Sequence, residues 1–228
     1  MRINKFVAQA TGLSRRAADT AIADGRVKLN GHVPSPGQEA TDQDIVTLDN
    51  RPVTAAVHIT TIMLNKPVGY VCSRMGQGSK TIYELLPPGL GHLKPVGRLD
   101  KDSSGLLLLT NDGKLANQLT HPSFAKEKVY EIVLNRSLDK SDYEKISTTG
   151  VDIGDGRPSR LQLAMLGSTA KWEVRMREGR NRQIRRSFSA LDYTVTRLHR
   201  TQFGAYSLDK LPVGKFQTTI PAPATKTM

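Results

Sequence analysis

Cysteine is almost absent from this chain of 228 residues, since Cys72 is the only one. A single cysteine excludes an internal disulfide and a cysteine-based zinc cluster, and beside Val71 it is typical of a small core residue. Long apolar runs are missing too, because the four leucines at 106–109 are far too few to cross a bilayer. The N-terminus, Met-Arg-Ile-Asn-Lys, has no apolar signal core behind it. We therefore expect a cytoplasmic protein with no membrane partner.

Acidic residues are scarce relative to basic ones. The 21 Asp and Glu face 33 Lys and Arg, which gives a net charge of +12, and the pI is near 10.0. Residues 171–200 hold nine basic residues against three acidic ones, a local net of +6. A solvated face normally mixes signs, so this segment favours a nucleic-acid partner. A basic protein of a ribosome-rich cytoplasm, with no specific partner, is the alternative.

The N-terminal quarter of the chain is expected to begin with two short helices. Apolar residues at spacings of three and four predict the first helix over 3–10, ended by Gly12. Ser14 stands where an N-cap belongs, and residues 15–24 are predicted as the second helix, stopped by Gly25.

Strands are predicted after the two helices. Residues 26–29 alternate polar and apolar, as an edge strand does, and Asn30-Gly31 is the strongest short hairpin signal in the chain. Residues 45–48 predict another strand. We therefore expect a small domain over 1–53, a linker over 54–60 and a larger domain over 61–228.

Basic residues gather at the front of the small domain, where Asp19 and Asp24 oppose Arg2, Lys5, Arg15, Arg16, Arg26 and Lys28. Free N–H groups at helix starts, together with arginine donors, suit phosphate oxygens. The runs at 2–6, 14–18 and 25–31 resemble the S-four-like RNA-binding domain. This resemblance implies that the six basic residues bind RNA, and it implies no chemistry. A basic surface on a folding module is the alternative.

A polar loop at 97–105 leads directly into the apolar run 106–109, which predicts a buried central strand. Residues 114–121 then predict a helix. A rigid strand that holds a polar loop is a common place for chemistry. The loop carries two carboxylates, Asp100 and Asp102, and spacing alone selects neither, because a turn-forming aspartate explains each of them equally well.

Tyr130 lies in a predicted strand over 128–134. Alternation places it with Ile132 and Leu134 on a largely apolar face. A core tyrosine with a hydrogen-bonded hydroxyl and an active-site tyrosine both fit this position.

A basic helix is predicted over 182–191. Ile184, Phe188 and Leu191 recur at i, i+4 and i+7 and form its apolar side. Arg185 is adjacent to the core-facing Ile184. A partly buried arginine needs an anionic partner, which is usually an aspartate.

Four runs of residues resemble, in order, the signature motifs of the RsuA/RluB/RluF family of ribosomal RNA pseudouridine synthases. They are NKPVG at 65–69, GRLDKDSSGLLLLTNDG at 97–113, KVYEIV at 128–133 and EGRNRQIRR at 178–186. The resemblance covers residues 1–216. It implies an α+β fold, with the small helix-helix-hairpin RNA-binding domain followed by a larger catalytic domain whose mixed, mainly antiparallel sheet is flanked by helices.

The resemblance also implies roles for residues. Asp100 matches the catalytic aspartate, and Arg185 matches the basic residue paired with it. Tyr130 matches the tyrosine that stacks on the target base and is proposed to help remove the proton from carbon 5. The implied substrate-binding residues are Arg98, which replaces the flipped nucleotide or contacts its phosphate, Ile184, which lines the uracil pocket, Lys66, which is structural or phosphate-binding, and Arg182. Arg180 and Arg186 are expected to bind RNA.

The implied reaction detaches uracil from its ribose, rotates it and rejoins it through carbon 5. It needs no redox change, metal or external energy, so we expect no cofactor. The chain also lacks an HExxH motif and a phosphate-cradling glycine loop. Asp100 must be ionised, as nucleophile or as base at the sugar, and Arg185 is expected to lower its pKa. The uridine must leave its stack, so base flipping is implied.

The expected partner is ribosomal RNA in an assembly intermediate, bound by a monomer. NKPVG, GRLDKDS and RQIRR favour RluF-like members, which act on large-subunit RNA, while a small-subunit or transfer RNA target stays open. Ser103 stands where the family usually has Thr, Gln217 stands where an Arg is expected, and a long basic tail is absent. An assembly factor without catalysis and a two-carboxylate hydrolase are the alternative functions.

Overall fold

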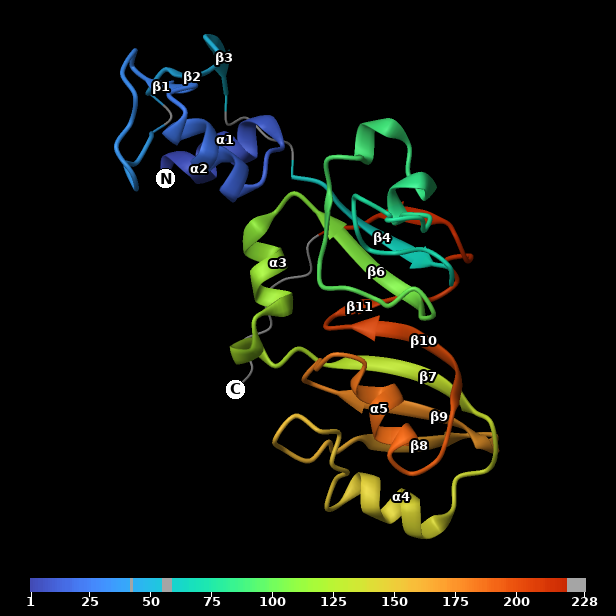
Figure 1. The fold of residues 1–228 in the computed structure, drawn as a ribbon. Coiled ribbons are helices and arrows are strands. Elements are labelled where there is room, and N and C mark those ends of the chain that lie inside the picture. The colour runs from blue at the N-terminus through green and yellow to red at the C-terminus, as the bar shows by residue number, and fades with distance from the viewer. Residues whose placement is uncertain (42, 55–58, 221–228) are drawn as a thin grey trace. The chain divides into compact units, whose positions relative to one another are not determined.

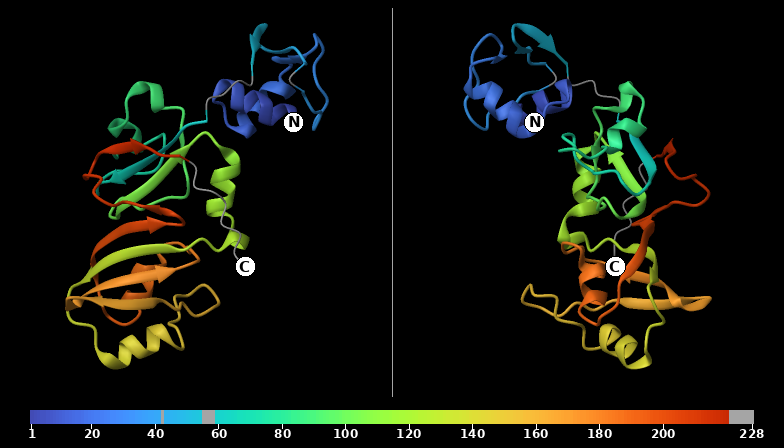
Figure 2. Two further views of the ribbon diagram at one scale, coloured as in Figure 1. Left: turned by 180° about the vertical axis from the view of Figure 1, so that it is seen from behind. Right: turned by 45° about the vertical axis from the view of Figure 1, so that its right-hand side comes forward.

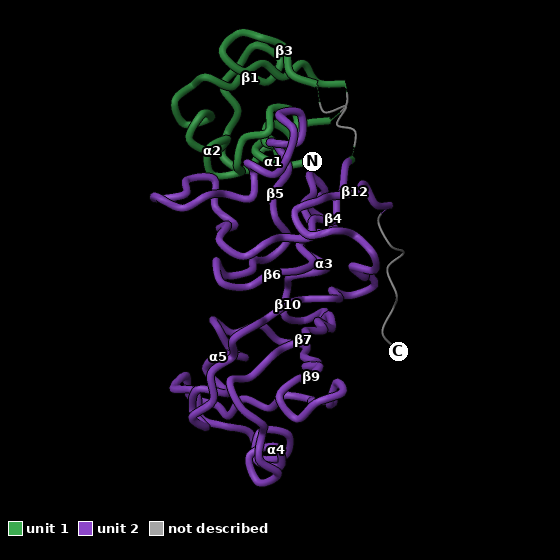
Figure 3. Tube along the Cα trace, turned by 90° about the vertical axis from the view of Figure 1, so that its right-hand side faces the viewer, with its two compact units in different colours: residues 1–59 green, residues 60–228 purple. Residues whose placement is uncertain are grey.

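The computed structural model describes residues 1–41, 43–54 and 59–220, and divides into two compact units, Met1–Ile59 and Thr60–Met228 (Figure 3). The linker expected at 54–60 falls mostly on residues 55–58, which lie outside the described residues. Within the described ranges, no helix combines the length and the apolar character that crossing a membrane requires.

The first unit begins with the two predicted helices, α1 (Ile3–Thr11) and α2 (Arg15–Ala23). Gly12 ends α1 in the left-handed conformation, at φ 77°, which glycine adopts without a side-chain clash. The Ser14 hydroxyl accepts a hydrogen bond from the Ala17 N–H at 3.0 Å. Both helix boundaries are therefore confirmed to within a residue or two.

A three-stranded antiparallel sheet completes this unit, with the order β1 (Val27–Leu29), β2 (Val46–Leu48) and β3 (Arg51–Val53). Asn30 and Gly31 both have positive φ, 51° and 87°, so the predicted turn forms. The predicted hairpin forms only as an isolated antiparallel bridge between Leu29 and His32, and the strand that pairs with the whole of β1 is β2. Burial of Val27, Leu29 and Val46 against the helices favours this longer-range pairing.

The second unit contains a mixed sheet in which β6 and β10 form a parallel pair and the other pairs are antiparallel (Figure 1). The main path runs β12-β4-β6-β10-β7-β9-β8, and the same strand order is seen from behind in Figure 2. The strands are β4 (Thr61–Lys66), β5 (Lys94–Pro95), β6 (Ser104–Thr110), β7 (Lys128–Leu134), β8 (Gln162–Leu166), β9 (Ser168–Met176), β10 (Val195–Phe203), β11 (Tyr206–Ser207) and β12 (Phe216–Thr218). The α+β prediction and the mainly antiparallel sheet are confirmed.

Both faces of the central strand β6 are buried, which explains its continuous leucine run. Leu107 and Leu109 belong to one apolar cluster, together with residues of β7, β9 and α5 (Gln183–Ser189). Leu106 and Leu108 belong to a second cluster, with residues of α3 (Gly113–Thr120). Alternate side chains of a strand point to opposite faces, so a strand covered on both faces is apolar throughout.

The remaining helices lie in the connections of the second unit. α4 (Lys140–Ser147) buries Ile146 in the same cluster as α5. Three short 3₁₀ helices span Ile82–Leu85, Pro88–Leu90 and Pro122–Phe124. The helix predicted over 114–121 is confirmed as α3, which Asp112 caps through a hydrogen bond to the Lys114 N–H at 2.8 Å.

Candidate active site

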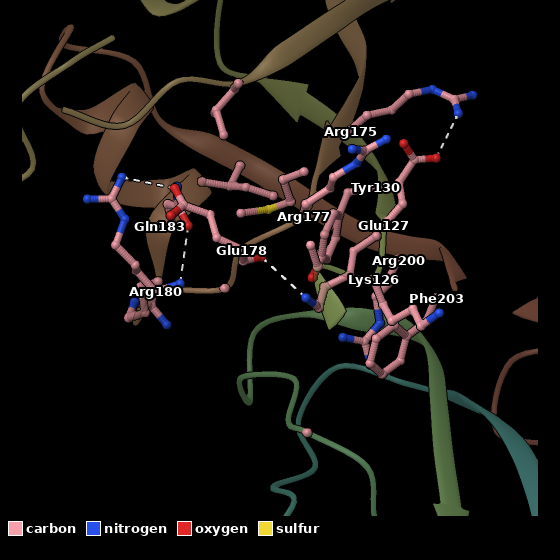
Figure 4. Close-up of a pocket in the computed structure, with 18 of the residues that line it drawn as sticks. Lys126, Glu127, Tyr130, Arg175, Arg177, Glu178, Arg180, Gln183, Arg200 and Phe203 are labelled. Atoms are coloured by element: carbon pink, nitrogen blue, oxygen red, sulfur yellow. Dashed lines mark hydrogen bonds and ion pairs between the residues drawn. The ribbon is translucent and has the colours of Figure 1, made fainter. Parts of the chain in front are cut away.

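The predicted loop enters a cleft of ≈ 1050 Å³ in the second unit (Figure 4). Its walls come from the loop before β6, the end of α3 with the segment that leads into β7, the start of β7, residues 157–162, the end of β9 with the turn into α5, and β10. Asp100, Tyr130, Ile184 and Arg182 all line this cleft. Residues separated by up to 84 positions in the sequence are thus brought to one site.

The loop before β6 is held in place by Lys66, which is fully buried at 0% exposure. Its ammonium donates hydrogen bonds to the carbonyls of Pro67 at 3.0 Å, Asp100 at 3.0 Å and Ser103 at 2.7 Å. Burial lowers the pKa of the Lys66 ammonium, because the charged form loses water. Of its two expected roles, the geometry agrees with the structural one, since no part of the side chain is left for a phosphate.

Asp100 presents its carboxylate at the cleft, with its side chain 36% exposed. Its backbone carbonyl is held by Lys66 and by the Ser103 N–H at 3.1 Å. One carboxylate oxygen, Oδ2, lies 3.3 Å from Nη1 of Arg182. The backbone contacts fix the position of the Asp100 main chain. Arg182 contacts Oδ2 alone, so the other oxygen, Oδ1, has no hydrogen-bond partner among the described residues.

Asp102 makes more contacts with arginine side chains than Asp100 does. Arg182 donates to both of its oxygens, at 3.1 and 2.8 Å, and Nε of Arg185 lies 3.2 Å from Oδ2. The hydrogen bonds from Arg182 lower the pKa of the Asp102 carboxyl, and the charges of Arg185 and Arg182 add to this against the opposing effect of desolvation.

The expected pairing of Arg185 with Asp100 is therefore wrong. Arg185 donates to the carbonyls of Val195 at 2.6 Å and Asp102 at 2.8 Å, and these two bonds hold its Nε toward the Asp102 carboxylate. The helix begins at Gln183, one residue later than predicted, and Arg182 precedes it in the left-handed conformation at φ 48°. This start brings the Arg182 guanidinium to Asp100.

Tyr130 lies on β7, directly opposite Arg200 of β10 and Val174 of β9. Only 8% of it is exposed, and its hydroxyl has no hydrogen-bond partner among the described residues. A core tyrosine normally satisfies its hydroxyl. Ile184 lies on the same cleft at 4% exposure, and Arg98 is exposed at its wall.

The basic residues expected to bind RNA fall into two groups. Arg26, Arg180 and Arg186 are engaged within the protein: Arg26 by Asp49, Arg180 by Asp155 and Glu178, and Arg186 by Asp155 and the Ile153 carbonyl. Lys28 donates to the Asn50 side chain at 3.3 Å. Among the described residues, no carboxylate pairs with Arg2, Lys5, Arg15 or Arg16.

Two cleft residues were missed by the sequence reasoning, Lys128 and Arg200. Figure 4 shows Arg200 near the Phe203 ring, on the side of the cleft away from Arg180 and Gln183. A signal was present, because Leu198 and Arg200 stand two residues apart on one strand and should share a face. In the structure both residues line the cleft.

Comparisons with known proteins agree with this geometry. The family model described as RNA pseudouridylate synthase matches residues 60–190, and the S4 domain model matches residues 1–46. An uncharacterised RNA pseudouridine synthase of Aquifex aeolicus is 37% identical, over 95% of this chain and 89% of its own length. A solved structure of a pseudouridylate synthase is 32% identical, covers 96% of both chains and superposes with a TM-score of 0.70.

The relatives whose names include a ribosomal subunit are divided between the large and the small subunit. The ribosomal small subunit pseudouridine synthase A of Pasteurella multocida is 34% identical, over 96% of this chain and 95% of its own. The ribosomal large subunit pseudouridine synthase B of Xanthomonas campestris is 36% identical over 92% of this chain, which spans only 45% of that longer protein.

Proposed function

The chain belongs to the RNA pseudouridylate synthase family, and we propose that it converts a specific uridine of ribosomal RNA to pseudouridine with Asp100 as the essential carboxylate. One observation carries this proposal. The Asp100 carboxylate and the Tyr130 ring both line a single cleft, with the apolar Ile184 at its wall. A flat, partly apolar base and its sugar need this combination of surfaces.

The chemistry assigned to Asp100 needs an ionised, accessible carboxylate. It acts either as nucleophile at C1′ of the ribose or as base at C2′, and both roles use the free oxygen of a group that Arg182 contacts through Oδ2 at 3.3 Å. Arg182 contacts the Asp100 carboxylate and orients it, and Arg185 supports the loop by holding Asp102. Tyr130 offers a flat face on which the extruded base stacks.

The flipped uridine leaves a gap in the RNA, and we assign the exposed Arg98 to that gap or to the neighbouring phosphate. The S4 domain supplies a second RNA-binding surface through basic residues that pair with no described carboxylate, namely Arg2, Lys5, Arg15 and Arg16. Free N–H groups at the start of α2 lie beside Arg15 and Arg16 and suit the same phosphate oxygens.

The target is proposed to lie in the large subunit, in an assembly intermediate bound by the monomeric enzyme. The RluF-like motifs at 65–69, 97–103 and 182–186 support this choice over a small-subunit site. Because relatives are named for each of the two subunits, one experiment should examine large-subunit and small-subunit RNA together.

The experiment treats ribosomal RNA from a strain that lacks the gene with the purified protein and maps pseudouridine by carbodiimide modification and primer extension. One new stop in large-subunit RNA is expected. A stop in small-subunit RNA would correct the target and leave the reaction standing. No new stop in either RNA would reject the enzyme and favour an assembly factor that binds without catalysis.

A further inference from the structure

Two cations that lie beside aromatic rings of the cleft have no role in the function proposed above, Arg200 on β10 and Lys128 on β7. Arg200 is directly opposite Tyr130 across the two strands, and Lys128 is directly opposite Phe203. Side chains directly opposite each other on neighbouring strands share one face of the sheet. The four residues therefore form a patch of two cations and two aromatic rings, here called the cation–aromatic patch, at one side of the cleft.

Arg200 is unusual because its positive charge is buried without a counter-charge. It is only 2% exposed, and none of the described carboxylates forms an ion pair with it. Nε donates to the Leu106 carbonyl at 2.8 Å, while the buried nitrogen Nη2 has no hydrogen-bond partner. Burying a charge is costly unless a partner compensates it, so an arginine in this state suggests a ligand that supplies the missing negative charge.

The other cleft arginines differ from Arg200 in this respect. Arg157, Arg175, Arg180 and Arg182 each form an ion pair with a carboxylate, and Arg98, Arg160 and Arg177 are exposed to solvent. Lys128 resembles Arg200, since its ammonium donates only to the Glu178 carbonyl, at 3.3 Å, and no carboxylate in the described ranges pairs with it. Of the described cleft cations, the buried one without a carboxylate partner thus lies beside Tyr130, with the half-buried Lys128 on the same strand as Tyr130.

The position of Arg200 favours a flat ligand that enters deeply. Its guanidinium carbon lies 6.0 Å from the centre of the Tyr130 ring and 4.9 Å from that of Phe203. A base stacked on Tyr130 brings its edge near this guanidinium. A backbone phosphate stays at the surface of the RNA, so it is a poor match for a side chain that is only 2% exposed.

We propose that Arg200, assisted by Lys128, stabilises the negative charge that uracil acquires while it is detached from the ribose. This inference rests on the proposed function. When the N1–C1′ bond breaks, its electron pair stays on uracil, and the anion is spread over N1, O2 and O4. C1′ meanwhile either bonds to an Asp100 oxygen or is stabilised by loss of the C2′ proton to Asp100.

Closing the cycle discharges the anion. After rotation the C5 electrons form the C5–C1′ bond, and either the C1′–O bond to Asp100 breaks or the proton returns to C2′. The proton on C5 then leaves and N1 takes one up, so atoms and charge balance. A fixed cation at the detached base lowers the barrier because it interacts more strongly with the anion than with neutral uridine.

The first test compares Arg200→Gln with wild type in single-turnover reactions on the same ribosomal RNA, with enzyme in excess. The rate of pseudouridine formation is expected to fall by about 100-fold, while the RNA affinity stays within about threefold, which is roughly 0.6 kcal/mol. Arg200→Lys is expected to recover part of the rate. Arg197→Gln is the matched control, because it removes an exposed arginine from the same strand and should leave the rate unchanged.

A second measurement separates charge stabilisation from a structural role. RNA with 5-fluorouridine at the target position forms a more stable anion, because fluorine withdraws electrons, so the first step depends less on Arg200. The loss caused by Arg200→Gln, measured as consumption of the target nucleoside, is expected to be several-fold smaller on this RNA. A structural defect would slow both substrates equally.

Several results would overturn the inference while leaving the proposed function intact. They are an active wild type with an equally active Arg200→Gln, equal losses on uridine and 5-fluorouridine, or a loss of RNA affinity with an unchanged rate, which would assign Arg200 to a phosphate. A wild-type protein that forms no pseudouridine in either ribosomal RNA would instead reject the proposed function, and this inference with it.

Discussion

The two aspartates of the loop, Asp100 and Asp102, differ in what holds them. The Asp100 carboxylate meets one arginine nitrogen at 3.3 Å, whereas Asp102 receives Arg182 on both oxygens and Arg185 on one. Sequence spacing could not tell them apart, and the pairing of Arg185 with Asp100 that the family resemblance implied is replaced by a contact with Asp102. The reason is the positive φ of Arg182, a local conformation that helical periodicity does not encode.

The pH dependence of stability should report the Asp102 contacts. The folded-state pKa of Asp102 is lowered, first by its hydrogen bonds from Arg182, so ionised Asp102 stabilises the fold above the unfolded-state pKa, near 3.8. This contribution is lost as the pH falls through the lower folded-state pKa. The difference in unfolding free energy between wild type and Asp102→Asn should therefore shrink below pH 3.8. A difference that stays constant from pH 7 to pH 2 would contradict this assignment.

Lys66→Met should cost about 2 kcal/mol of unfolding free energy, because one buried and two partly buried carbonyls lose a charged donor. The same variant should lose activity, since the loop carbonyl of Asp100 is no longer held. Urea unfolding measures the first effect and pseudouridine formation the second. Lys114→Met, at an exposed lysine of α3, is the control and should change neither. A variant as stable and as active as wild type would show that Lys66 does not anchor the loop.

Among the elements, those with strong local signals were predictable. α1, α2, α3 and the buried strand β6 follow from periodicity, caps and turn residues. The partner of β1 was not, because a good turn at Asn30-Gly31 can form without joining two strands. The parallel pairing of β6 with β10 could not be predicted from the sequence either, since it joins residues 95 positions apart through long-range packing.

Gly105 makes the approach of β6 to β10 possible, and replacing it should break this pair of strands. A Cβ at this position would lie 2.2 Å from the Arg200 carbonyl oxygen, and the residue has φ 106°. Gly105→Ala should cost about 3 kcal/mol or more and disturb Arg200 directly. Thermal unfolding and activity are the measurements.

Gly113→Ala is the matched control for this element. Nothing lies within 4 Å of its added Cβ, and the residue begins α3, so the variant should be neutral or slightly stabilised. Equal unfolding free energies for Gly105→Ala and wild type would contradict the close approach.

At the scale of the whole molecule, net charge was the first property from which a partner could be predicted. The net charge of +12 predicted a polyanionic partner, and both matched family models are of RNA-related proteins. Composition could not show which basic side chains remain available to bind RNA phosphates. Arg26, Arg180 and Arg186 are paired inside the protein, whereas Arg15 and Arg16 are exposed without a carboxylate among the described residues.

Replacing Arg15 and Arg16 together by Ala should weaken ribosomal RNA binding and lower the slope of log affinity against log salt by about 1.5, at roughly 0.7–0.9 for each lost phosphate contact. The rate at saturating enzyme should not change, because neither residue lies in the catalytic unit. Arg26→Ala, at an arginine held by Asp49, should reduce the slope less. Filter binding over a salt series measures these effects, and an unchanged slope for the double variant would reject the assigned phosphate contacts.

The most direct test of the whole account compares Asp100→Asn with Asp102→Asn in pseudouridine formation on ribosomal RNA. The two residues stand in one loop, so general damage to the loop affects both. The account predicts that Asp100→Asn abolishes the reaction while RNA affinity is kept, and that Asp102→Asn retains measurable activity. An Asp100→Asn variant that still forms pseudouridine would contradict it.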